Sequence, residues 1–173
     1  MSAWRSIRVA LLGAESSGKS TLAAALAERY ATLWVPEYLR EFVETRQRVP
    51  LASEQFMIAS TQLARERAAD AHAARYLFCD TTPLMTAIYS DFYFRAVDTE
   101  LAALCAAQRY DHTLVTAPDS PWVADGLQRE SEQVRLAIHA RLLAELEARA
   151  IPYLLLTGSL EQRLAQVAQL LGH

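Results

Sequence analysis

Residues 13–20 read Gly13-Ala14-Glu15-Ser16-Ser17-Gly18-Lys19-Ser20, and Thr21 follows them. The stretch matches in full the pattern G-x-x-x-x-G-K-[ST], in which backbone N–H groups of a tight turn converge on phosphate oxygens. The apolar run Ile7 to Leu12 precedes it, and the Ala/Leu-rich segment Lys19 to Tyr30 follows. We therefore expect a strand, a phosphate-binding turn and a helix whose N-terminus faces the phosphate.

Two side chains of this stretch have a specific chemistry in a phosphate site. Lys19 is expected to reach the β- and γ-phosphates of ATP, and the Ser20 hydroxyl to bind Mg²⁺. The 17 basic residues of the chain are sixteen arginines and this one lysine. A compact, flexible ammonium suits a site wrapped around phosphates better than the planar guanidinium does. The alternative is a Gly/Ser-rich turn that binds no ligand. A dinucleotide site is excluded, because the chain has no G-x-G-x-x-G.

Short apolar runs alternate with longer helical segments along the whole chain. Strands are expected at 7–12, 33–35, 76–79, 112–116 and 153–156. Helices are expected at 19–30, 37–45, 83–93, 98–109 and 130–148, with two more that begin at Ser53 (to residue 74) and at Ser159. This alternation predicts an α/β fold, with about five parallel strands and helices on both faces, in a single domain over residues 1–173.

Two carboxylates follow expected strands, at the sheet edge where ligands of such folds bind. Asp80 ends the third strand and is expected to hold Mg²⁺ or to accept the proton of the acceptor hydroxyl; alternatively it caps the following turn. Glu37 follows the second strand and either orients the acceptor or only stabilises a helix N-terminus. Arg40 and Glu41 are expected to form an exposed pair.

The segment 118–130 is rich in Pro, Asp and Gly and precedes a helix that carries Arg135. We expect a lid that closes over the γ-phosphate and excludes water, with Arg129 or Arg135 stabilising the transferring phosphoryl group. The alternative is an ordinary surface loop that Trp122 anchors to the core.

Composition narrows the class of protein further. The net charge is −3 with a pI near 5.8, which gives no general attraction to nucleic acid or to acidic membranes. Apolar runs are too short to span a membrane, and Cys79 and Cys105 lie in apolar surroundings typical of buried thiols. We expect a cytoplasmic protein acting on a small molecule, of undetermined oligomeric state.

Four strings together resemble one known family, the NadR-type ribosylnicotinamide kinase domain. They are GAESSGKST at 13–21, EYLREF at 37–42, FCDT at 78–81 and PWVADGL at 121–127. The resemblance implies a P-loop kinase fold and Mg²⁺- and ATP-dependent phosphorylation of nicotinamide riboside to nicotinamide mononucleotide. It implies that residues 13–21 bind ATP, that Asp80 is the strand-end carboxylate, and that Glu37, Tyr38, Arg40 and Trp122 lie at the substrate.

The chain departs from this family at one position, and its function has alternatives. The family lid reads D-G-x-R, whereas Gln128 stands at the fourth position here and Arg129 comes next. The acceptor could be another nucleoside or a small alcohol, or the chain could be a nucleotide-dependent binding or regulatory ATPase. A GTPase switch is excluded, because the chain has no asparagine for an N-K-x-D motif.

Overall fold

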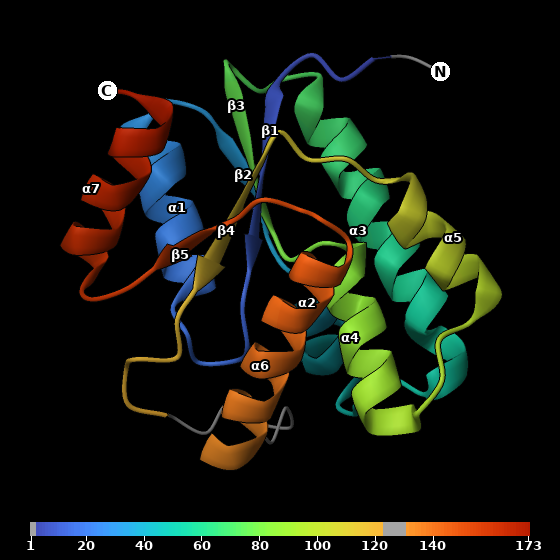
Figure 1. Cartoon of the computed structure of the whole chain (residues 1–173). Coiled ribbons are helices and arrows are strands. Elements are labelled where there is room, and N and C mark those ends of the chain that lie inside the picture. Colours follow the sequence, from blue (N-terminus) through green and yellow to red (C-terminus); the bar gives the residue numbers. More distant parts are fainter. Residues whose placement is uncertain (1–2, 123–130) are drawn as a thin grey trace.

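The computed structural model describes residues 3–122 and 131–173, and its centre is a parallel sheet in the order β2-β3-β1-β4-β5 (Figure 1). The strands are β1 (Ile7–Leu12), β2 (Leu33–Val35), β3 (Tyr76–Asp80), β4 (His112–Thr116) and β5 (Leu154–Leu156). Every neighbouring pair runs parallel. The carboxyl ends of all five strands therefore open on one edge of the sheet.

The helices cover both faces of this sheet. They are α1 (Lys19–Arg29), α2 (Tyr38–Arg46), α3 (Gln55–Asp70), α4 (Pro83–Phe94), α5 (Thr99–Ala107), α6 (Glu132–Ala148) and α7 (Leu160–Leu171), with a short 3₁₀ helix at Ala52–Glu54. Figure 1 shows α1 and α7 on one side of the sheet and α3, α4 and α6 on the other. Within the described ranges, no helix is long and apolar enough to cross a membrane.

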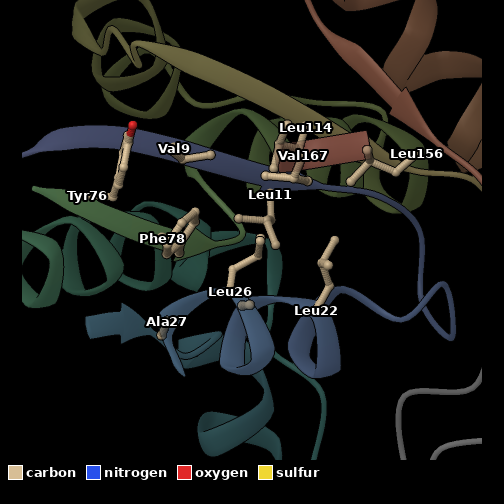
Figure 2. Packing of buried hydrophobic residues seen from close by; sticks show 11 residues of the cluster. Val9, Leu11, Leu22, Leu26, Ala27, Tyr76, Phe78, Leu114, Leu156 and Val167 are labelled. Carbon is tan, nitrogen blue, oxygen red and sulfur yellow. The ribbon is translucent and has the colours of Figure 1, made fainter. Parts of the chain in front are cut away.

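The central strand β1 is buried on both sides, which fixes the loop that leaves it. Val9 and Leu11 pack toward α1 and α7 with Phe78 and Leu114 (Figure 2), whereas Ala10 and Leu12 pack toward α4 and α6. Each fully buried Leu or Val contributes about 1.5–3 kcal/mol to folding. The phosphate-loop sequence therefore begins at the best-anchored strand end of the sheet.

The expected elements are confirmed, with shifts at some ends. Ser53 was expected to cap the long helix, but it lies inside the 3₁₀ helix and α3 begins at Gln55. Glu54 is the N-cap residue of α3 by position, but its carboxylate caps the 3₁₀ helix, where it accepts from the Leu51 N–H, and it pairs with Arg48. The same helix ends at Asp70, before the expected residue 74. Asp70 binds the N-terminal segment instead, through the N–H of Arg5 and both the N–H and hydroxyl of Ser6.

The last two helices have side-chain caps. Helix α6 begins at Glu132, two residues after the expected start, because the Ser131 hydroxyl accepts from the Val134 N–H. Helix α7 begins after Ser159 as expected, with a capping box between Ser159 and Gln162. These caps set the direction in which both helices approach the carboxyl edge of the sheet.

Candidate functional site

The loop between β1 and α1 has a backbone that only glycine fits at two points. A Cβ added to Gly13 would lie 2.3 Å from Thr116 Oγ1 and 2.9 Å from Ser17 Oγ. Gly18 has φ +87°, and an added Cβ would lie 3.1 Å from the Arg163 guanidinium. The first glycine lets the loop pass against β4, and the second makes the turn into α1. Gly18 is also the N-cap of α1, so the positive end of the helix dipole faces the loop.

Side chains inside the loop hold its shape. The Ser17 hydroxyl donates to the Ala14 carbonyl at 2.6 Å and lies 2.7 Å from Thr116 Oγ1 on β4. The Lys19 side chain is buried, and its Nζ donates to the same Ala14 carbonyl at 3.4 Å. The ammonium thus lies across the loop, where a phosphate oxygen can take the place of this long bond. Ser17 has a structural role that the pattern alone did not predict.

Asp80 lies beside the loop, at the end of β3. It is fully buried, and its Oδ2 accepts from the Ser20 hydroxyl at 2.6 Å. Its Oδ1 has no hydrogen-bond partner within the described part of the chain. A buried carboxylate with one unsatisfied oxygen, next to a hydroxyl, is a donor set that suits a hard cation such as Mg²⁺. The two residues expected to bind the metal are therefore brought together.

Two buried arginines, one from a helix on each face of the sheet, bind carbonyls of the phosphate loop. Arg135 on α6 donates to the Ser16 carbonyl at 3.0 Å and to the Ser120 carbonyl at 2.7 Å, and it pairs with Glu132 at 2.7 Å. Arg163 on α7 donates to the Ser17 carbonyl at 2.5 Å. Because these carbonyls bind the arginines, the backbone N–H groups of the loop remain available to bind a ligand.

Arg163 also binds the segment that follows β4. Its guanidinium donates to the Ala117 carbonyl at 3.0 Å and pairs with Asp119 at 2.6 Å, and Asp119 accepts from the Gly158 N–H. Burial raises the pKa of Asp119, but the Gly158 N–H and the Arg163 charge outweigh it and hold that pKa below its usual value. The loops after β1, β4 and β5 are thereby tied into one unit.

Sequence reasoning missed Arg163, although the sequence carried a signal. Arg163 lies four residues before Val167, on the apolar stripe of α7, and both are buried. Arg135 is likewise buried on α6, on the same face as Ile138 and Leu142. An arginine on the buried face of a helix needs internal partners. Here the partners are loop carbonyls. A role for Arg135 on the transferring phosphoryl group stays a prediction.

A cleft of about 470 Å³ lies over the phosphate loop. Residues 15–21 form its floor, and Glu37, Arg40, Ser120 and Pro121 form its walls. Glu37 also lines a second, small pocket of about 20 Å³ together with Gln55, Gln62, Thr81 and Tyr89. It is the N-cap of α2, with no capping bond from its side chain. Glu37 thus lines both the phosphate cleft and the small pocket that Thr81 also lines.

Other predicted site residues lie further from this cleft or outside the described ranges. Tyr38 packs edge-on against Phe42 and beneath the Arg65 guanidinium, and it does not line either cavity. Trp122 is half-buried, and the cleft lining ends at Pro121. Residues 123–130 are not described, so Arg129 and most of the predicted lid lie outside the described residues.

Arg40 and Glu41 are both exposed, as expected. Glu41 binds Arg65 of α3 through both carboxylate oxygens. Consecutive residues on a helix do not face each other, so Glu41 turns to α3 while Arg40 lines the cleft. Among residues 3–122 and 131–173, no three His, Cys, Asp or Glu side chains could hold a metal ion together. A cation here would therefore need oxygens from a bound ligand as well.

Comparison with known proteins agrees with this arrangement. Residues 8–163 match the AAA domain family. The trifunctional NAD biosynthesis/regulator protein NadR of Salmonella typhimurium is 31% identical over 142 residues, which are 80% of this chain and 35% of that protein. Its counterpart in Escherichia coli is 32% identical over the same shares. The chain thus spans about a third of the length of these curated relatives.

Solved structures have the same fold. A crystal structure of a NadR protein in complex with NAD and AMP-PNP has a TM-score of 0.80 at 22% identity, over 97% of this chain and 50% of that one. A thymidylate kinase from Ehrlichia chaffeensis has a TM-score of 0.65 at 14% identity, over 96% and 98%. These likenesses confirm the predicted fold, that of the P-loop kinases.

Proposed function

The chain belongs to the AAA domain family, and on that premise we propose that it is an ATP-dependent kinase that phosphorylates nicotinamide riboside. The observation that carries the proposal is the bond between Ser20 and Asp80, at 2.6 Å, beside a complete phosphate loop. It supports a site for Mg²⁺ and the phosphates of ATP, which phosphoryl transfer requires. A strand-end carboxylate is placed where a kinase needs metal ligation or an acceptor for the hydroxyl proton.

The roles of the residues follow from their positions. The N–H groups of residues 13–21 would bind the phosphates of ATP, and Lys19 would neutralise the charge that develops on the transferring group. Ser20 and Asp80 would hold Mg²⁺, which when bound neutralises phosphate charge. Glu37 faces the cleft from the side of the small pocket and would orient the acceptor hydroxyl for in-line attack.

Three kinds of evidence support nicotinamide riboside as the acceptor. The family strings at 13–21, 37–42 and 78–81 lie along the rim of one cleft or at the strand end beside it. The curated relatives are NAD biosynthesis proteins. A NadR protein crystallised in complex with NR has the same fold, with a TM-score of 0.78 at 21% identity. Another nucleoside is the second candidate, since a deoxyadenosine kinase also has this fold, with a TM-score of 0.62.

An acceptor panel tests the proposal. Purified protein, Mg²⁺ and ATP are incubated with nicotinamide riboside, with the common ribo- and deoxyribonucleosides and with glycerol, and ADP release and product mass are recorded. We expect the highest kcat/KM on nicotinamide riboside and a product heavier by one phosphoryl group. A preference for another nucleoside would replace the acceptor only, whereas acceptor-independent ADP release would favour a regulatory ATPase.

A further inference from the structure

Thr81 has a strained backbone at the edge of the candidate site. It follows Asp80 at the end of β3 and has φ +74°, and its N–H donates to the Leu11 carbonyl at 3.0 Å. The left-handed region is uncommon for any residue with a side chain and rare for a β-branched one. Such strain persists where the surrounding structure imposes it, and it gathers at functional sites.

The side chain of Thr81 is also unsatisfied. It is only 7% exposed, and its Oγ1 has no hydrogen-bond partner in residues 3–122 and 131–173. Most buried hydroxyls are hydrogen-bonded, because an unpaired one carries the full loss of hydration. The Thr81 hydroxyl therefore lies where no described residue forms a hydrogen bond with it.

A small pocket lies beside Thr81. Thr81 lines the small pocket with Glu37, Gln62 and Thr86. Gln62 is already occupied, because its amide accepts from the Tyr38 N–H and donates to the carbonyls of Pro36 and Asp80. The cavity of about 20 Å³ has room for one small polar group, such as a hydroxyl.

We propose that Thr81 is an acceptor-binding residue, whose hydroxyl forms a hydrogen bond with a sugar hydroxyl of the nucleoside bound beside Glu37. The inference rests on the proposed kinase function and adds a contact that fixes the acceptor. Thr81 lines this pocket together with Glu37, and it directly follows Asp80 in the chain. Specificity of this kind arises because an analogue without the hydroxyl leaves a buried polar atom unpaired.

The test compares Thr81→Val, which removes the hydroxyl and keeps the shape, with Thr81→Ser, which keeps the hydroxyl. Calorimetric titration with nicotinamide riboside and, separately, with ATP is combined with urea unfolding of each variant. We expect Thr81→Val to weaken nucleoside binding by about three- to tenfold, the range for one net hydrogen bond. Thr81→Ser should stay within about twofold, ATP affinity should not change, and Thr81→Val should unfold at the same or higher urea concentration.

Four results would overturn the inference. If Thr81→Val binds nicotinamide riboside as tightly as the wild type does, the Thr81 hydroxyl makes no stabilising contact with the nucleoside. Earlier urea unfolding of Thr81→Val shows that the hydroxyl is satisfied within the folded protein, for example by an ordered water, and has a structural role. If the wild-type protein binds none of the nucleosides in the panel, the proposed function fails together with this inference, whereas active Thr81→Val with unchanged KM overturns the inference alone.

Discussion

Replacement of Arg163 by alanine tests whether contacts from α7 stabilise the phosphate loop. The variant removes donors to the Ser17 carbonyl at 2.5 Å and to the Ala117 carbonyl at 3.0 Å, and it leaves Asp119 without its partner. A buried acceptor left unpaired costs about 1–3 kcal/mol. Asp119 is partly exposed and can be rehydrated, so we count only the two carbonyls, at about 1–2 kcal/mol each, and expect a loss of about 2–4 kcal/mol.

Urea and thermal unfolding measure this loss. For a chain of this length, about 2–4 kcal/mol corresponds to a fall in Tm of roughly 5–15 °C. Arg149→Ala is the matched control, since Arg149 pairs with Glu145 at 3.0 Å but the two side chains are 38% and 45% exposed. That variant should lose only about 0.3–0.5 kcal/mol. If both variants unfold at the same urea concentration, the bracing of the loop by Arg163 is refuted.

Three further predictions concern the site and one titrating group. Lys19→Ala should abolish turnover while Tm stays within a few degrees of wild type, because within the described residues the Lys19 ammonium makes one long bond, to the Ala14 carbonyl; near-normal turnover would exclude the assigned phosphate role. Asp80→Asn should lower kcat at least about a hundredfold with a smaller change in KM, whereas Glu37→Gln should lower kcat/KM for the acceptor and spare ATP affinity; equal effects on both ligands would contradict the separate roles. Burial lowers the pKa of His139, whose Nδ1 has no partner in the described ranges. Below the ordinary pKa of 6.5 the unfolded chain therefore binds a proton that the folded chain does not, and stability should fall from pH 7.5 to pH 5.5. His139→Gln should reduce this slope in urea unfolding at the two pH values, and an unchanged slope would assign the effect to other groups.

The elements of the fold could be predicted because local patterns determine them. Strands such as Ile7–Leu12 and Tyr76–Asp80 are apolar on both faces, as parallel strands must be when helices cover both sides of a sheet. Ser159 marks a helix start because its hydroxyl caps α7, and Pro83 does so because its fixed φ suits the first turn of α4. The start of α3 was misplaced because a 3₁₀ helix at Ala52–Glu54, whose first turn Glu54 caps, comes before it.

Part of the candidate site could also be predicted from local sequence patterns. The motif placed Lys19 and Ser20, and the strand-end position placed Asp80 beside them. Contacts between distant segments could not be read from spacing. Arg163 meets Ser17 across 146 positions of sequence, and the Thr81 N–H donates to the Leu11 carbonyl of β1. Such contacts depend on how α7 and β3 pack, which no local pattern encodes.

Phosphorus NMR of one reaction mixture tests the central claim most directly. Wild-type protein, Mg²⁺, ATP and nicotinamide riboside are followed until the ATP is consumed, with Lys19→Ala as the control. The assignment of residues 13–21, Asp80 and Glu37 to phosphoryl transfer predicts a phosphomonoester signal that grows in equal amount with ADP, and neither signal in the control. Release of ADP with inorganic phosphate and no monoester would contradict it, because water and not the nucleoside would then be the acceptor.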